Sequence, residues 1–275
     1  MRLLRGAWWV VAALAVGATV ATPASAVETT ALSGIKYVAL GDSYAAGVGL
    51  ANYDADSAEC YRSPTAYGPV WAANHGVASF TFAACSGATT EGVKAQTAAL
   101  AADTRLVTVS VGGNDVGFSS VLAACRFGTD QQCDGALAGS ATAIQSVLPA
   151  RLAETYQLIA TAAPRARVAA VGYPHLFELG TCVGDDFAEV RRARINELAD
   201  SLADVTAAAV AAAGRRFVFV DTRAYFAGHG VCSTTPWIHA LRAQTFESYH
   251  ANQEGHDHGF YPALTEALCA RPVTA

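Results

Sequence analysis

Short runs of nearly continuous apolar residues recur along the chain, separated by longer alanine-rich stretches. Five of the runs have the length of strands, at residues 37–40, 78–83, 106–111, 167–173 and 216–221. Strands that are apolar on both faces are typical of parallel sheets covered by helices on each side. The pattern therefore predicts five buried, parallel strands.

The stretches between these runs are predicted to be helical, at residues 63–76, roughly 135–163 and 186–213. In the first, Ser63 suits the N-cap position, Pro64 the first turn and Gly76 the end of the helix. Alternation of strands and helices over the whole length predicts one α/β domain with three layers, a parallel sheet between two layers of helices.

The first 26 residues differ from the rest of the chain. Arg2 and Arg5 precede an apolar stretch that runs from Ala7 to about Ala21, and the segment ends in Ala24-Ser25-Ala26. A basic start, an apolar centre and a small-x-small end predict a cleaved secretory signal peptide, with a membrane anchor as the alternative. No later run is long and apolar enough to span a bilayer. We therefore expect a secreted protein without a stable membrane anchor, whose single domain covers residues 27–275.

All seven cysteines lie after the predicted signal. An oxidising compartment favours disulfides, and the absence of any C-x-x-C pair argues against a metal site. Cys125 and Cys133 enclose a short loop and are expected to pair. The next pairs that we expect are Cys60–Cys85 and Cys182–Cys232, which leaves Cys269 over.

The charge pattern excludes some partners. Acidic residues outnumber basic ones by 23 to 18, and the basic residues form no patch. Nucleic acid and anionic membrane surfaces are therefore not expected partners. We expect a monomer that acts on a small-molecule or lipid substrate.

Small polar residues follow the first three predicted strands. These are Gly41-Asp42-Ser43, the segment "ACSGATT" with Gly87, and Gly112-Gly113-Asn114-Asp115. The carboxyl ends of parallel strands meet at one edge of the sheet, where ligands bind in such folds. The histidine-rich segment "FESYHANQEGHDHGFYP" lies near the C-terminus.

Together these residues supply the parts needed for acyl transfer. Ser43 offers a hydroxyl nucleophile, and His250 offers an imidazole that takes its proton. The backbone N–H groups of Ser43 and Gly87 and the side-chain amide of Asn114 offer donors for an oxyanion. Asp42 and Asp115 are expected to hold the turns together.

In these blocks the chain resembles the GDSL/SGNH hydrolases, particularly the secreted actinomycete esterases and lipases with three disulfides. The resemblance covers about residues 35–265 and rests on four segments in order: "GDSYAAGVG", "ACSGATT", "GGND" and "ESYHANQEGH". It implies a flavodoxin-like fold, hydrolysis of esters through an acyl-enzyme, and an oxyanion hole formed by Ser43, Gly87 and Asn114.

One position departs from the family pattern. The family commonly has an aspartate three residues before the histidine, and this chain has Glu247 there. The Glu247 carboxylate is one candidate for orienting His250. A backbone carbonyl, as in some actinomycete relatives, is the other.

Other interpretations of the same residues are weaker. A phosphate-binding loop at Gly41, Gly47 and Gly49 lacks the Lys-Ser/Thr that it requires. A metal site could use His250 with His256 and His258, but the last two are expected to be surface or capping residues, so we expect no metal and no cofactor. Tyr173 is expected to pack in the core.

The sequence thus predicts a secreted serine esterase or lipase acting on lipid or simple acyl esters. Within the same scaffold the alternatives are a carbohydrate O-deacetylase or a phospholipase A. A non-catalytic secreted protein that binds metal or glycan is the remaining alternative.

Overall fold

The computed structural model describes residues 34–50, 52–182 and 187–270, so the predicted signal peptide lies outside the described residues. A five-stranded sheet crosses the centre in the order β2-β1-β3-β4-β5, with every neighbouring pair parallel. The strands are β1 (Lys36–Gly41), β2 (Ser79–Phe82), β3 (Thr104–Ser110), β4 (Arg167–Val171) and β5 (Phe217–Val220). The five predicted strands are confirmed, with ends that shift by at most two residues.

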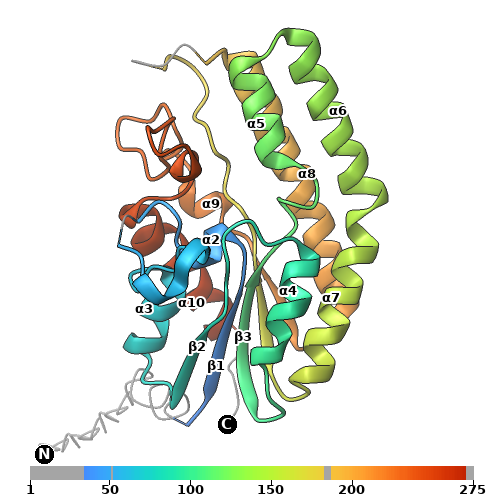
Figure 1. Cartoon of the computed structure of the whole chain (residues 1–275), viewed down its shortest axis with the longest axis vertical. Helices are drawn as coiled ribbons and strands as arrows, with labels where there is room; N and C mark the ends of the chain where they lie inside the picture. The colour runs from blue at the N-terminus through green and yellow to red at the C-terminus, as the bar shows by residue number, and fades with distance from the viewer. Residues whose placement is uncertain (1–33, 51, 183–186, 271–275) are drawn as a thin grey trace, which may run out of the picture.

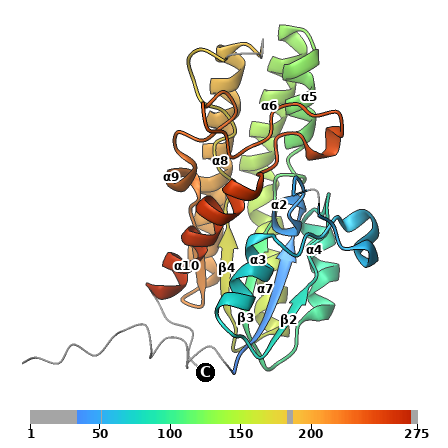
Figure 2. The same cartoon turned by 90° about the vertical axis from the view of Figure 1, so that its left-hand side faces the viewer.

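Helices cover both faces of the sheet (Figures 1 and 2). One face carries α3 (Tyr67–Asn74) and α10 (Tyr261–Cys269), and the other carries α4 (Thr90–Gln96), α7 (Leu148–Ala162) and α8 (Glu189–Ala213). The antiparallel pair α5 (Phe118–Phe127) and α6 (Asp130–Ser146) packs with α8 and extends beyond the carboxyl edge of the sheet (Figure 1). The predicted three-layer α/β fold is confirmed.

Short elements complete the chain. They are α2 (Ser43–Ala46), α9 (Arg223–Phe226), the 3₁₀ turns Ala55–Cys60, Thr97–Ala99 and Thr245–Glu247, and the π-helical turn Gly255–Phe260. The edge strand β2 is partly exposed, whereas the central strands β1, β3 and β4 are almost fully buried, as Leu40, Leu106 and Val109 show. This burial on both faces is the reason why the strands lack polar alternation.

The prediction of one helix over 135–163 is wrong, because the structure has two helices here. Helix α6 begins earlier, after Thr129, whose side chain and that of Gln132 form a reciprocal cap. The break lies at Val147, and Pro149 stands in the first turn of α7. Proline tolerates a first turn but cannot donate a hydrogen bond within a continuous helix, so it separates the two.

The start predicted for the helix at 63–76 is also wrong. Helix α3 begins at Tyr67, and Ala66 is its N-cap without a side-chain bond. The Ser63 hydroxyl instead accepts from the backbone N–H of Thr65, at 3.3 Å, within the preceding turn. Residues 63–66 therefore form a turn rather than the first turn of a helix, with Ser63 and Ala66 buried and Pro64 exposed.

Three disulfides join Cys60 to Cys85, Cys125 to Cys133 and Cys182 to Cys232, the same pairs that the sequence suggested. Cys269 takes no part in them. The first bond lies beside β2, and the second joins α5 to α6. Across the described residues, we find no helix with the length and apolar character needed to cross a membrane.

Candidate active site

Ser43 is the first residue of α2 and lies directly after the end of β1. The preceding Asp42 caps this short helix, because its Oδ1 accepts from the backbone N–H of Tyr44 at 3.0 Å. Gly41 has a φ of +134°, and a Cβ atom there would lie 2.6 Å from the carbonyl oxygen of Ser110. Glycine is therefore required for the sharp turn that carries Ser43 out of the sheet.

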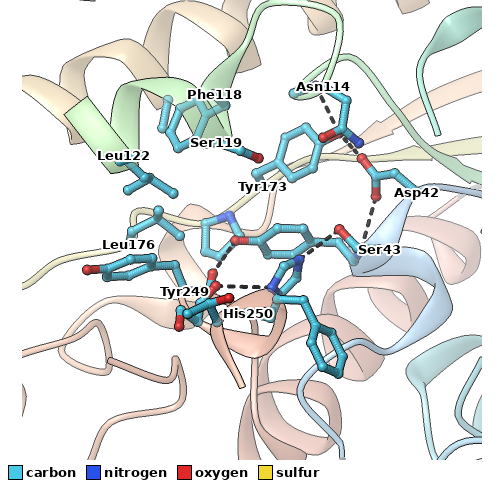
Figure 3. Close-up of a pocket in the computed structure, with 18 of the residues that line it drawn as sticks. Asp42, Ser43, Asn114, Phe118, Ser119, Leu122, Tyr173, Leu176, Tyr249 and His250 are labelled. Atoms are coloured by element: carbon cyan, nitrogen blue, oxygen red, sulfur yellow. Dashed lines mark hydrogen bonds between the residues drawn. The ribbon is translucent and has the colours of Figure 1, made fainter. Parts of the chain in front are cut away.

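His250 meets Ser43 across this turn. Its Nε2 lies 2.7 Å from the Ser43 Oγ, and its Nδ1 lies 3.1 Å from the carbonyl oxygen of Ser248 (Figure 3). A carbonyl only accepts hydrogen bonds, so the hydrogen of the neutral ring is on Nδ1 and the lone pair on Nε2 faces the hydroxyl. The pair has the arrangement of a nucleophile and its base.

Burial lowers the pKa of His250 from 6.5 to about 4. The ring is therefore neutral at pH 7, in the form that accepts a proton. The Ser248 carbonyl acts in the opposite direction, because it stabilises the protonated ring, but its effect is smaller than that of burial.

Of the two candidates for orienting His250, the Glu247 side chain has other partners in this structure. The buried carboxylate of Glu247 accepts from the Tyr53 hydroxyl at 2.8 Å and pairs with the Arg242 Nε at 3.1 Å. The backbone carbonyl of Ser248 holds Nδ1 instead, which was the other candidate. The backbone turns between Ser248 and His250, because Tyr249 has a φ of +62°. This turn brings the Ser248 carbonyl, rather than the Glu247 carboxylate, to the His250 ring.

The Asn114 side chain lines the same pocket as Ser43 and His250. One hydrogen of its amide bonds to the carbonyl oxygen of Ala88 at 3.0 Å, which fixes the group and leaves a second hydrogen for a ligand. The next residue, Asp115, binds the backbone N–H and the hydroxyl of Thr90. The Asn114 turn and the loop after β2 are thus fastened to each other, as expected for Asp115.

Gly87 lies on that loop after β2, with a φ of +76°. It is exposed, and a Cβ atom added there would have no neighbouring atom within 4 Å. Its backbone is therefore open to an approaching ligand. Gly87 is not among the residues that line the pocket in this structure.

A pocket of about 290 Å³ extends from Ser43 and His250. Helix α5 contributes Phe118 and Leu122 to its lining (Figure 3). Other apolar residues that line it are Phe127, Leu176, Leu202, Leu241 and Phe246. The sequence predicted no helix between the strand at 106–111 and the helix at roughly 135–163, so it missed helix α5 as part of this pocket. Tyr173, expected in the core, also lines the pocket and bonds to Asp42.

The other two histidines of the segment lie apart from this site. His258 is exposed, whereas His256 is buried against Tyr67, whose backbone N–H donates to its Nδ1 at 3.2 Å. Of the two positions expected for His256, surface or capping, the surface position is therefore wrong, and burial lowers its pKa to about 3. Within the described part of the chain, His, Cys, Asp and Glu side chains form no group of three or more that could hold a metal ion.

Comparison with known proteins gives one family. Residues 39–258 match the model of the GDSL-like lipase/acylhydrolase family. A lipase of Streptomyces rimosus is 39% identical over 252 residues, which are 91% of this chain and 91% of the relative.

Two crystal structures are similar over nearly their whole length. The extracellular lipase from Streptomyces rimosus has 40% identity and a TM-score of 0.81, covering 85% of this chain and 99% of the lipase. Phospholipase A1 from Streptomyces albidoflavus NA297 has 39% identity and the same TM-score of 0.81, covering 84% of this chain and 98% of the phospholipase.

Proposed function

The chain belongs to the GDSL-like lipase/acylhydrolase family and is a carboxylic-ester hydrolase, and we propose that it works through an acyl-enzyme formed on Ser43. The observation that carries this proposal is the 2.7 Å contact between the Ser43 Oγ and the His250 Nε2 at the base of an apolar pocket.

In the proposed reaction His250 takes the hydroxyl proton while the Ser43 Oγ attacks the ester carbonyl carbon. The carbonyl oxygen becomes negative and accepts hydrogen bonds from the Asn114 amide and the backbone N–H groups of Ser43 and Gly87. Protonated His250 then donates its proton to the departing alkoxide, which leaves as the alcohol. Water, deprotonated by the same ring, hydrolyses the acyl-enzyme and restores Ser43.

The Ser248 carbonyl takes the place of a third side chain. It holds the Nδ1 hydrogen throughout and stabilises the positive ring that forms during attack, because the carbonyl dipole points its negative end at Nδ1. The proposed machinery is therefore a Ser43–His250 dyad with a backbone acceptor, without the Glu247 side chain.

The pocket favours lipid or simple acyl esters as substrates. Its lining is mainly aliphatic and aromatic, which suits an acyl chain better than the acetyl group of a sugar ester. A phospholipase A activity is a second candidate, supported by the 39% identity to the phospholipase A1 of Streptomyces albidoflavus. Rates on short-chain, long-chain, phospholipid and acetylated-sugar esters would separate these substrates.

We also propose that residues 1–26 are a cleaved secretory signal and that residues 27–275 form one monomeric, extracellular domain. The similarity to an extracellular lipase and the three disulfides support this location. Sequencing the N-terminus of the exported protein and measuring its mass in solution would test both statements.

The central test is Ser43→Ala. The variant should keep its melting temperature and lose both hydrolysis of a chromogenic ester and labelling by a fluorophosphonate. Ser146→Ala, on the exposed side of α6, is the matched control and should remain active. A folded Ser43→Ala protein that keeps its activity would overturn the assignment of the nucleophile.

A further inference from the structure

The hydroxyl group of Tyr173 lies between two of the turns that form the active site. Tyr173 follows β4 after one intervening residue, and its hydroxyl donates to the Asp42 Oδ2 at 2.5 Å. The same oxygen accepts from the backbone N–H of Gly113 at 3.2 Å (Figure 3). One hydroxyl therefore joins the residue before Ser43 to the residue before Asn114.

The bond to Asp42 affects the nucleophile directly. Asp42 is buried, and its carboxylate caps α2 by accepting from the Tyr44 N–H, so its position fixes the first turn on which Ser43 stands. Burial raises the pKa of this carboxyl to about 7, and the hydrogen bond from Tyr173 opposes that rise. Burying a charged carboxylate is unfavourable unless it is hydrogen-bonded, so the Tyr173 hydroxyl helps to stabilise Asp42 in this position.

The bond to Gly113 affects the oxyanion donor. The β1–β3 pairing ends at Gly41 and Ser110, so the residues that follow are no longer held by the sheet register. Beyond this point the Asn114 turn is fastened to the loop after β2, through Ala88 and Thr90. Backbone bonds also join these loops to the turn of Ser43, from the Asp42 N–H to the Ser110 carbonyl and from the Cys85 N–H to the Gly41 carbonyl, each at 2.9 Å. The Tyr173 hydroxyl adds the side-chain link that reaches both Asp42 and Gly113.

We propose that Tyr173 is a positioning residue for ester hydrolysis, whose hydroxyl sets the distance between the Ser43 nucleophile and the Asn114 donor. This inference rests on the proposed function of those two residues. Catalysis depends strongly on such distances, since a displacement of about 1 Å can cost about 10²-fold in rate.

The aromatic ring has a separate role, which the test must leave intact. It packs edge-on against Tyr44, with ring centroids 5.2 Å apart, and lines the substrate pocket. Tyr173→Phe keeps the ring and removes only the hydroxyl. Substrate binding should therefore persist in this variant while the two turns lose the side-chain link through the hydroxyl.

The matched control is Tyr37→Phe. The Tyr37 hydroxyl is also buried, and it bonds to the Thr108 hydroxyl at 2.8 Å. Tyr37 stands near the start of β1, at the opposite end of the strand from Ser43. Both variants lose one buried hydroxyl, but only one of these hydroxyls touches the active-site turns.

We expect Tyr173→Phe to lower kcat about 10- to 100-fold with KM within about threefold of wild type, which is the loss that a small displacement causes. Tyr37→Phe should lose thermal stability with kcat within about twofold. A folded Tyr173→Phe protein with wild-type kcat, or an equal loss of kcat in Tyr37→Phe, would overturn the positioning role.

A double-mutant cycle with Asn114→Ala shows whether the hydroxyl acts through that donor. In the Asn114→Ala background the Tyr173→Phe effect should shrink to about threefold or less, since no Asn114 donor is left to position. An undiminished effect would overturn the inference. Fluorophosphonate labelling of wild type distinguishes a failure of the proposed function from a failure of the positioning role. Absence of label on Ser43 refutes the proposed function. Normal labelling together with an unaltered kcat in Tyr173→Phe refutes only the positioning role of Tyr173.

Discussion

Glu247→Gln tests how the histidine is oriented. In a triad the third carboxylate holds Nδ1, and replacing it with an amide lowers kcat by about 10⁴, or about 5.5 kcal/mol of barrier. Here the Ser248 carbonyl holds Nδ1 at 3.1 Å, and Glu247→Gln leaves that carbonyl in place. We therefore expect kcat within about tenfold of wild type, equivalent to about 1.4 kcal/mol.

The same change should reduce stability. The Glu247 carboxylate is 5% exposed, accepts from the Tyr53 hydroxyl and pairs with the Arg242 guanidinium. The amide that replaces the Glu247 carboxylate keeps one oxygen as an acceptor. Either its NH₂ group or its uncharged oxygen then faces the positive charge of Arg242. The loss of one charged hydrogen bond predicts a decrease of about 1–3 kcal/mol in the free energy of unfolding.

The assay is steady-state hydrolysis of a chromogenic ester, with folded protein quantified by denaturant unfolding. Glu178→Gln is the control, because that carboxylate also fastens a loop, through the Gly230 N–H at 3.1 Å, and has no contact with His250. If folded Glu247→Gln turns over substrate about 10³-fold more slowly than wild type, and Glu178→Gln does not, the carbonyl assignment is refuted and the triad is restored.

Three further predictions follow from the site. Asn114→Ala should lower kcat by about 10²–10³ with KM nearly unchanged, as measured by steady-state kinetics, because it removes one oxyanion donor; a change confined to KM would contradict this. His250 has a pKa lowered from 6.5 to about 4, so its contribution to stability is present above pH 6.5 and is lost as the pH falls towards 4. Unfolding at pH 7, 5.5 and 4 should show a larger decrease in wild type than in His250→Gln, where the remaining decrease comes from groups such as the buried His256. Replacing Cys60 and Cys85, which are 25 residues apart, with serine should lower the free energy of unfolding by about 3.5 kcal/mol. The same change should lower kcat, because Cys85 lies two residues before Gly87. An unaltered kcat would show that the loop holds its position without the disulfide.

The sheet and the assembly of the site could be predicted because each depends on local sequence. The central strands β1, β3 and β4 are buried and therefore almost continuously apolar, which made them visible in the sequence. The edge strands β2 and β5 are less buried but keep apolar phenylalanine and valine residues. The turn after β1 requires glycine at position 41, and a parallel sheet brings the carboxyl ends of its strands to one edge. Ser43 and Asn114 could therefore be placed together without any coordinates.

The pocket wall could not be predicted in this way. Helix α5 is ten residues long, begins after Gly117 without a side-chain cap, and buries only Val121 and Cys125 fully. Isolated helices of that length are marginal in water, so packing against α6 and the Cys125–Cys133 bond stabilise it. Such contacts between elements are not visible in a local pattern, which is why the sequence predicts no helix between residues 111 and 135.

The orientation of His250 depends on a single unusual backbone conformation. Tyr249 has a φ of +62°, a region that costs a side-chain-bearing residue about 1–2 kcal/mol. The surrounding contacts stabilise it: the Tyr44 hydroxyl donates to the Tyr249 carbonyl at 2.6 Å, and His239 exchanges backbone hydrogen bonds with Tyr249 and His250. Because Tyr44 stands next to Ser43, the nucleophile turn itself helps to hold the bend that brings the Ser248 carbonyl to the base. The Glu247 carboxylate, three residues before His250, therefore binds Tyr53 and Arg242 instead of the histidine ring. The spacing of Glu247 and His250 in the sequence is the same in this arrangement as in a catalytic triad, so spacing alone does not distinguish the two.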